Sequence, residues 1–357
     1  MKKVLYITNL PAPYKIVFFD LLSKDVDLTV VYERKKASDR NDNWKSDLKR
    51  SYKEKYLKGK NIGKEASFST EILAILKKNH YDIVIINGYS SPTAILAIAY
   101  MRMFHVRYAI ACDGMLPASD SFIKKYLKTF LIEGASYFLS SGKITDEQLI
   151  KYGAQQKEIY RYPFSSVSER DLLKGFADKE EFKRKIGCTS KRMLLYVGQF
   201  IERKGIDILF ETIKGLDEDF QLFMVGGEKT QASLFKGYDN PQIKYCGFKT
   251  KEELADYYKA ADLLLLPTRK DIWGLVVNEA LSFGVPVITT KNCGAGLELI
   301  KDGVNGYIID YNSTNLRKIF DCNYDLLRKG CLKTAEHNTI EKMAMNISEI
   351  IYSESKR

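Results

Sequence analysis

Short apolar runs alternate with stretches of helical periodicity along most of the chain. Val4–Asn9 is an apolar run, Tyr14–Ser23 has helical spacing, and Leu28–Tyr32 is a second apolar run. Apolar runs of this length are typical of strands buried in a parallel sheet, with helices making the connections between them. The pattern therefore predicts an α/β protein that starts with a strand.

The alternation continues to about residue 162. Helices are predicted at Thr70–Asn79, Pro92–Met101, 122–134 and Thr145–Tyr152, and strands at Asp82–Asn87, Arg107–Cys112, Tyr137–Ser140 and Ile159–Tyr162. The helix at 122–134 is amphipathic, with Ile123, Tyr126, Leu127, Phe130 and Leu131 on one face and lysines elsewhere. We expect this apolar face to pack onto the sheet, and a position on a membrane surface is the alternative.

A second α/β series follows a change of character between residues 163 and 190. Pro163 and the serines after it indicate a linker near 164–170, and Asp178–Ile186 is a charged helix. Strands are predicted at Met193–Gly198, Phe220–Val225, Ile243–Cys246, Asp262–Leu266, Val285–Thr290 and 308–309, and helices at Gly205–Lys214, Lys251–Ala260 and Ile340–Tyr352.

The length and the two series together predict two domains. At 357 residues the chain exceeds the size at which one core keeps growing. We expect two doubly wound, Rossmann-like domains, 1–166 and 167–338, that face a cleft, with the helix in 339–357 packing back on the first domain. Ligands in such sheets bind at the carboxyl ends of the strands.

Charge adds one candidate surface. The chain carries a net charge of +11, and segment 33–64 alone has twelve Lys or Arg against five Asp or Glu, which gives +7. This excess suits an anionic partner such as a membrane surface, a polyphosphate or a nucleic acid, or it is simply a solvated surface. No nucleic-acid recognition module occurs, so nucleic acid is not expected as a partner.

Other features exclude several classes of protein. No apolar stretch is long enough to span a membrane, and the N-terminus lacks the pattern of a signal peptide. The six cysteines form no C-x-x-C pair and the three histidines are far apart, so we expect a cytosolic protein with reduced thiols and no metal site. The acidic triplet 217–219 matches D-x-D, a metal-dependent transferase pattern, but its position before a strand favours a solvated turn.

The richest stretch for chemistry is 267–306, in which a strand, a loop and a helix N-terminus follow one another. Such a helix N-terminus attracts anions through its unpaired N–H groups and its dipole. Asp271 is either a helix N-terminal cap or loop-capping residue, or a ligand contact. Glu279 lies among apolar helical neighbours and is either a solvated edge residue or an acceptor of hydrogen bonds from ligand hydroxyls.

A second candidate, Gly198–Gly205, reads G-Q-F-I-E-R-K-G and also links a strand to a helix. Gly198 allows close approach of the backbone, and Arg203 and Lys204 supply cations that a diphosphate needs. Arg203 could equally form a surface salt bridge, whereas phosphate binding is favoured for Lys204. Neither G-x-G-x-x-G nor the P-loop motif occurs, which argues against nicotinamide and P-loop chemistry.

These stretches together resemble the retaining GT-B glycosyltransferases of family four. The similar segments are Asp271–Glu279 as the E-x7-E region, Y-V-G-Q-F-I-E-R-K-G-I-D (196–207), Y-C-G-F-K-T-K-E-E-L (245–254), A-D-L-L-L-L-P-T (261–268) and L-E-L-I-K-D-G-V-N-G (297–306). They cover most of 193–310 in the family's order.

The resemblance implies roles for individual residues in binding a nucleotide sugar. Glu279 would hold the ribose hydroxyls, Asp271 would contact the donor sugar, and Lys204 would pair with the diphosphate. The backbone of Gly274, Leu275 and Val276 would bind sugar and phosphate, and Phe248 and Lys249 would lie near the base. Two positions depart from the family: Gln199 stands where an Arg is frequent, so Arg203 would compensate, and Asp271 stands where a Glu is usual.

The first half resembles family members of bacterial surface-polysaccharide assembly through 6–14 and A-C-D-G (111–114). Cys112 replaces a histidine of many relatives, and Asp113 would orient an acceptor hydroxyl or only cap its strand. The resemblance implies a cytoplasmic, metal-independent, retaining hexosyltransferase without a cofactor. Its co-substrate would be a UDP- or GDP-linked sugar and its acceptor a saccharide, free or lipid-linked, with segment 33–64 docking on an anionic membrane. The alternative is a non-catalytic protein of this fold that binds polyanions or nucleotide sugars.

Overall fold

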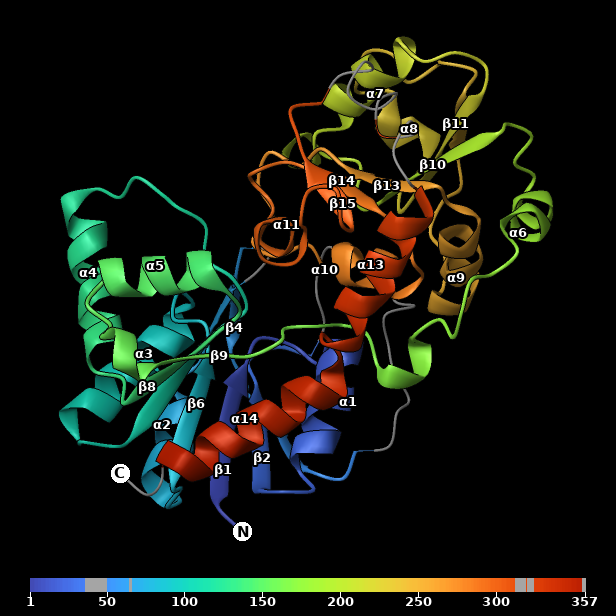
Figure 1. The fold of residues 1–357 in the computed structure, drawn as a ribbon. Helices are drawn as coiled ribbons and strands as arrows, with labels where there is room; N and C mark the ends of the chain where they lie inside the picture. Colours follow the sequence, from blue (N-terminus) through green and yellow to red (C-terminus); the bar gives the residue numbers. More distant parts are fainter. Residues whose placement is uncertain (36–49, 64–65, 312–318, 320–323, 355–357) are drawn as a thin grey trace. The chain divides into compact units, whose positions relative to one another are not determined.

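The structure is a computed structural model that describes residues 1–35, 50–63, 66–311, 319 and 324–354. The chain forms two compact units, Met1–Ser165 with Thr339–Arg357 (unit 1) and Ser166–Asn338 (unit 2). Each unit has its own parallel sheet flanked by helices (Figure 1). The predicted pair of α/β, Rossmann-like domains is therefore confirmed. The chain passes from unit 1 to unit 2 after Ser165, and its last residues belong to unit 1.

Among the described residues, unit 1 contains a sheet in the order β3-β2-β1-β6-β7-β8-β9, in which all neighbours are parallel. These strands are β1 (Lys3–Thr8), β2 (Asp27–Tyr32), β3 (Lys53–Tyr56), β6 (Ile83–Asn87), β7 (Tyr108–Cys112), β8 (Tyr137–Ser140) and β9 (Ile159–Arg161). A separate antiparallel pair consists of β4 (Lys60–Ile62) and β5 (Ala66–Phe68). Segment 33–64 thus contains β3 and β4, and its residues 36–49 and 64 lie outside the described part of the chain.

Helices cover both faces of this sheet because its strands are apolar on both sides. The helices α2 (Glu71–Lys78), α3 (Pro92–Met103), α4 (Phe122–Glu133) and α5 (Lys143–Lys151) share one core with Leu5 and Ile7 of β1. Tyr6, which points to the opposite face, packs against α1 (Pro13–Leu22), its ring centroid 4.8 Å from that of Phe19. The last helix, α14 (Ile340–Glu354), lies beside α1 on this second face.

Helix α4 corrects one expectation. It forms where the sequence predicts, but Phe122, Ile123 and Tyr126 are exposed and do not pack onto the sheet. Only Leu131 and Ile132 of this helix are buried. At roughly 100° per residue, these two lie on the side of the helix away from Phe122 and Tyr126. The helix therefore buries Leu131 and Ile132 and leaves the rest of its apolar face exposed.

Unit 2 repeats the parallel arrangement, in the order β12-β11-β10-β13-β14-β15 among the described residues. The strands are β10 (Arg192–Val197), β11 (Phe220–Val225), β12 (Ile243–Tyr245), β13 (Leu263–Leu266), β14 (Val287–Thr289) and β15 (Gly306–Ile308). The helices are α6 (Lys179–Ile186), α7 (Ile206–Lys214), α8 (Lys229–Ala232), α9 (Lys251–Ala260), α10 (Leu275–Ser282), α11 (Gly294–Leu299) and α13 (Tyr324–Glu336). Short 3-10 turns are η2 (Gln156–Glu158) in unit 1 and η3 (Glu169–Asp171) and η4 (Glu202–Lys204) in unit 2.

Buried charges attach α6 to this sheet. The Asp262 carboxylate lies 3.2 Å from Nζ of Lys179 and 3.1 Å from Nζ of Lys183, and it accepts a hydrogen bond from the Met193 N–H. Burial by itself raises the pKa of Asp262, but the two ammonium groups outweigh it and hold that pKa below its ordinary value. The first charged helix of unit 2 is thereby fixed to the start of β13.

The strand order of both sheets locates where ligands can bind. From its first strand the chain proceeds to one edge of the sheet, and it then returns to the other side of that first strand. The reversal falls between β1 and β6 in unit 1 and between β10 and β13 in unit 2. At such a reversal the connections leave in opposite directions, which opens a crevice outside the carboxyl ends of the two strands.

Candidate functional site

Two loops meet at the reversal in unit 2. One follows β10 and contains η4, and the other comprises residues 267–274 after β13. Gly205 lets them approach: its φ is +73°, and a Cβ at this position would lie 2.0 Å from the carbonyl oxygen of Pro267. The Arg203 carbonyl in turn accepts a hydrogen bond from the Arg269 N–H at 2.9 Å. The two loops are therefore in direct backbone contact.

Lys204 and Asp271 form an ion pair where these loops meet. Their side chains are only 15% and 13% exposed. The Asp271 backbone is fixed on both sides, because its N–H donates to the Asn292 carbonyl and its own carbonyl accepts from the Gly294 N–H. The N-cap residue of α10 is Gly274, so Asp271 is not the cap of this helix.

Helix α10 starts beside this pair. Gly274 has a φ of +99°, and a Cβ there would lie 3.0 Å from Cys293 Sγ and 3.4 Å from an Asp271 carboxylate oxygen. Leu275 and Val276, both half-buried, form the first turn. The first N–H groups of a helix have no partner within the helix, and the dipole makes this end positive. The arrangement of a lysine and a helix N-terminus suits a phosphate group.

Glu279 lies one turn further along α10, and it is held by hydrogen bonds from two side chains. The Tyr258 hydroxyl donates to Oε2 at 2.9 Å, and the Ser166 hydroxyl donates to Oε1 at 3.4 Å. Burial raises the pKa of Glu279 above its ordinary value, while both hydrogen bonds oppose the increase. The Tyr258 ring stacks on Phe283, with centroids 5.3 Å apart. Glu279 is thus a positioned carboxylate rather than a solvated edge residue.

The structure places the remaining residues predicted in unit 2 along the same edge of the sheet. Gly198 follows β10 with a φ of +152°, and Gln199 next to it is exposed. The Arg203 guanidinium donates to the Lys270 carbonyl at 2.7 Å and so lies on the loop that carries Asp271. Phe248 and Lys249 follow β12, two strands away from β10, and Lys249 pairs with Glu253 at 3.7 Å.

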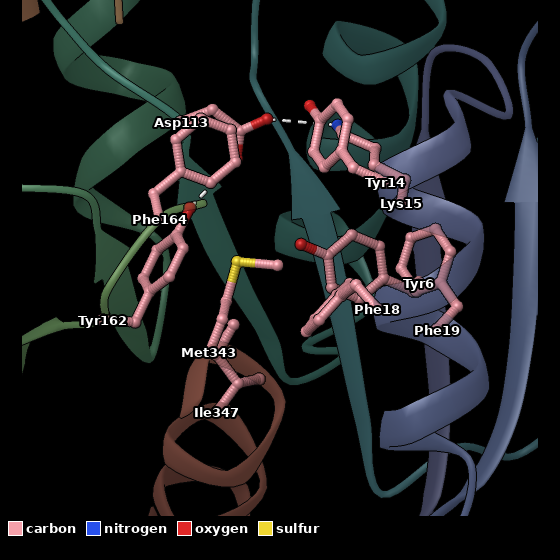
Figure 2. A pocket seen from close by; sticks show the side chains of 10 residues that line it. All are labelled: Tyr6, Tyr14, Lys15, Phe18, Phe19, Asp113, Tyr162, Phe164, Met343 and Ile347. Carbon is pink, nitrogen blue, oxygen red and sulfur yellow. Dashed lines mark hydrogen bonds and ion pairs between the residues drawn. The ribbon is translucent and has the colours of Figure 1, made fainter. Parts of the chain in front are cut away.

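A polar cluster lies at the reversal in unit 1 (Figure 2). Lys15 of α1 approaches the carboxylate of Asp113 to 3.1 Å and the hydroxyl of Thr8 to 3.2 Å. The amide of Asn87 and the hydroxyl of Tyr162 both donate to Asp113 Oδ1 at 3.0 Å. These residues come from the ends of β1, β6, β7 and β9, so they converge because parallel strands end at one edge.

Aromatic and aliphatic side chains line a pocket beside this cluster: Tyr6, Tyr14, Phe18, Phe19, Phe164, Met343 and Ile347 (Figure 2). Burial raises the pKa of Tyr162, so its hydroxyl stays protonated and donates to Asp113. The pocket thus combines ring faces with a carboxylate whose neighbours are donors.

Sequence reasoning identified Asp113 but missed its partners Lys15, Asn87 and Tyr162. Asn87 ends a buried strand and Lys15 lies in the first turn of the first helix. Their places in the topology would therefore have been enough to identify them as candidates. Tyr258 and Ser166 were also missed. Tyr258 lies near the end of α9 and Ser166 opens unit 2, so no local pattern in the sequence links either residue to Glu279.

The described residues contain neither a candidate metal cluster nor a membrane-spanning helix. Within that part of the chain, no group of three His, Cys, Asp or Glu side chains is close enough together to hold a metal ion. The triplet 217–219 lies exposed in a turn before β11, as predicted. Among the same residues, every helix is too short or too polar to cross a membrane.

Comparisons with known proteins agree with this geometry. Residues 178–319 match the family described as glycosyl transferases group 1, a span that contains Lys204, Asp271 and Glu279. An uncharacterised glycosyltransferase of Methanocaldococcus jannaschii is 34% identical over 255 residues, 67% of this chain and 70% of that protein. An uncharacterised protein of the Klebsiella pneumoniae cps region is 25% identical over 270 residues, 72% of this chain and 73% of that protein.

The fold has solved counterparts as well. The Anabaena protein HepE, crystallised with UDP and glucose, superposes with a TM-score of 0.78 over 99% of this chain and 100% of its own, at 15% identity. This likeness confirms the predicted GT-B fold. The identity and coverage of the Methanocaldococcus relative, together with the matched family span, establish the family. The chain belongs to the glycosyltransferase group 1 family.

Proposed function

We propose that this glycosyltransferase moves a hexose from a UDP- or GDP-linked sugar to a saccharide or lipid-linked saccharide, with retention of configuration and without a metal ion. The observation that carries the proposal is the Lys204–Asp271 pair at the start of α10, with Glu279 one turn further on. This group offers a cation from one loop and, from the loop and helix after β13, a helix N-terminus and two carboxylates. Those are the parts that a diphosphate, a sugar and a ribose require.

Each part of the donor then has a partner. The diphosphate binds between Lys204 and the first N–H groups of α10, with Arg203 as a further cation on the neighbouring loop. Asp271, paired with Lys204, accepts hydrogen bonds from hydroxyls of the sugar. Glu279 accepts from the ribose hydroxyls, while Gly198 and Gln199 border the site where close approach of the backbone is needed.

The chemical step follows from these positions. An acceptor hydroxyl attacks the anomeric carbon from the face on which the diphosphate leaves, and the bond from that carbon to the diphosphate oxygen breaks. The leaving group takes the bonding electrons, and its phosphate oxygen receives the acceptor's proton. Lys204 and the helix N-terminus stabilise the charge that develops on the diphosphate. A well-aimed hydrogen-bond donor of this kind lowers the activation free energy by about 3 kcal/mol.

The acceptor belongs beside Asp113 of unit 1. This carboxylate, held by Lys15, Asn87 and Tyr162, is placed to orient a sugar hydroxyl. The Klebsiella relative from a cps region supports a role in bacterial surface-polysaccharide synthesis. The UDP and glucose bound to HepE make UDP-glucose the first donor to test.

Donor binding is tested by thermal shift and calorimetry with UDP- and GDP-sugars. A donor at about 100 times its Kd adds about 2.7 kcal/mol of stability, a shift of several degrees. Glu279→Ala should abolish the shift, and Glu218→Ala, in the exposed turn, should leave it intact. A protein that ignores all of these donors would favour the polyanion-binding alternative.

Turnover is tested by release of the nucleoside diphosphate in the presence of saccharide acceptors and EDTA. Continued activity in EDTA supports the absence of a metal requirement, and NMR of the product distinguishes retention from inversion. Donor binding without any release, across a broad acceptor panel, would instead favour a nucleotide-sugar-binding protein. Inverted product would contradict the retaining mechanism while leaving the donor site intact.

A further inference from the structure

The outward face of α4 is the largest group of exposed apolar side chains on one helix of the described chain. Phe122 is 85% exposed, Ile123 79% and Tyr126 71%, and Leu127 and Phe130 are exposed as well. At roughly 100° per residue, these five side chains occupy one continuous arc of the helix. Isolated exposed apolar residues need no explanation, but a contiguous group on one helix marks an interaction surface.

The end of α3 extends this surface. Arg102 donates to the Phe130 carbonyl, and its guanidinium lies over the Phe130 ring, 4.3 Å from the centroid. Met103 and Phe104, which follow Arg102 directly, are both exposed. Two exposed apolar side chains therefore follow directly on the residue of α3 that contacts α4.

The charges around the apolar arc identify the occupant. Lys124 and Lys125 lie on the two sides of the arc and are exposed, and neither has an acidic partner among the described residues. Asp120, the acid nearest the helix N-terminus, is neutralised by Lys128 at 2.7 Å. Apolar and aromatic side chains between flanking lysines are the pattern of a helix that lies in the interface of an anionic membrane.

We propose that α4, with Met103 and Phe104, docks this protein onto an anionic lipid surface. The aromatic and aliphatic side chains enter the boundary between headgroups and acyl chains, and Lys124 and Lys125 reach the headgroup phosphates. Membrane binding through this helix goes beyond the proposed transferase activity and does not depend on it. It also differs from docking through segment 33–64, which the sequence suggested.

The test is sedimentation of the full-length protein with vesicles of phosphatidylcholine alone or mixed with phosphatidylglycerol. The wild type should bind the mixed vesicles at low salt. The triple variant Phe122→Ser, Ile123→Ser, Tyr126→Ser should bind them roughly 100-fold more weakly, because it lacks three apolar side chains that would enter the lipid. Lys124→Gln with Lys125→Gln should lose roughly 30-fold on mixed vesicles and little on neutral ones.

The control variant carries Leu234→Ser and Met345→Ser, which replace two exposed apolar residues outside α4 and the end of α3. It should bind the vesicles as the wild type does. All replaced side chains are exposed, so an unchanged melting temperature verifies folding. Thermal shifts induced by the nucleotide sugar should be the same in every variant. Vesicle binding therefore tests the membrane proposal, and the thermal shift tests the transferase proposal independently.

Three results would overturn the proposal. The wild type could ignore anionic vesicles at low salt, or the triple variant could bind them as the wild type does, which would place docking elsewhere. In the third, light scattering would show a wild-type dimer that the triple variant converts to monomer, which would assign the apolar face to a second copy of the chain.

Discussion

Lys204 and Asp271 neutralise each other in the described structure, and this pairing has a consequence for catalysis. An ion pair that is mostly shielded from water keeps the lysine in place before a donor arrives. A diphosphate can then approach without a large rearrangement, because the cation already points to the start of α10. Preorganisation of this kind is a main source of electrostatic catalysis.

We therefore predict that Lys204→Ala lowers kcat by roughly 100- to 1,000-fold, since it removes a cation from the leaving diphosphate. Nucleoside diphosphate release at saturating donor measures the effect. Lys214→Ala removes an exposed lysine paired with Glu211 and should leave the rate unchanged. A variant that raises only KM would show that Lys204 binds the ground state and transition state equally.

A second prediction concerns the pH dependence set by Glu279. Burial raises the pKa of Glu279, and the Tyr258 hydrogen bond opposes this by stabilising the charged form. Donor binding that needs the carboxylate weakens as the pH falls through this pKa. Tyr258→Phe removes the stabilising bond and raises the pKa further, so the loss of binding should begin at higher pH.

Donor affinity measured calorimetrically across the acid range checks this shift. Tyr257→Phe is the neighbouring control, since the Tyr257 hydroxyl makes no hydrogen bond to Glu279. If Tyr258→Phe weakened donor binding equally at every pH, Tyr258 would act through packing on Phe283 and not through the ionisation of Glu279.

The junction between η4 and α7 depends on a glycine for two separable reasons. Gly205 and Gly187 have the same backbone conformation, φ +73° and ψ +33°. A Cβ at Gly187 would meet open space, whereas at Gly205 it would lie 2.0 Å from the Pro267 carbonyl oxygen. The pair thus separates the cost of a left-handed conformation from the cost of the close contact.

Gly187→Ala should lower the melting temperature by a few degrees, since a left-handed alanine costs about 1 kcal/mol. Gly205→Ala should lower it by roughly 10 °C, because the collision adds to the same strain. It should also weaken donor binding by displacing Lys204. Equal melting temperatures for the two variants would mean that the loops separate at little cost.

At the level of the complete chain, the last helix stabilises the first unit. Ile347 of α14 is buried beside Tyr6 and Phe19 in unit 1, although it follows all of unit 2 in the sequence. Ile347→Ala should destabilise unit 1 by about 2–5 kcal/mol, because it leaves a cavity in that core. Donor affinity should not change, since the donor residues lie in unit 2.

Denaturant unfolding, together with donor calorimetry on the folded protein, tests this separation. Met345→Ala, on the exposed side of the same helix, is the control and should stay within about 0.5 kcal/mol of the wild type. A large change in donor affinity for Ile347→Ala at unchanged stability would contradict the assignment of α14 to unit 1 alone.

Local patterns were sufficient for most elements, because buried parallel strands and their helices leave strong periodic signals. The apolar runs at β1, β6, β10 and β13 were recognised within one or two residues. Helix α4 shows the limit of this reasoning. Its periodicity reveals an apolar side, but a single helix carries no information on whether that side faces a sheet or the solvent.

The candidate site divides in the same way. Lys204 and Asp271 lie in loops that link a strand to a helix, and Glu279 lies in the helix that follows the second loop, so local sequence was enough to identify them as candidates. The partners of the site residues come from distant parts of the sequence. Tyr258 contacts Glu279 from another helix, and in unit 1 Asp113 is contacted by Lys15, far before it in the sequence, and by Tyr162, far after it. Such contacts follow from strand order, which periodicity does not encode.

The amino-acid sequence thus specified the α/β class, the two sheets and the stretch around Asp271 and Glu279, because each rests on interactions between near neighbours. Folding in three dimensions added the Lys204–Asp271 pair, the cluster around Asp113 and the outward direction of the apolar side of α4. The physical reason is that pairing and burial depend on which strands become neighbours and on which sides of a helix remain uncovered. Those outcomes are settled by packing of the entire unit, not by any one segment.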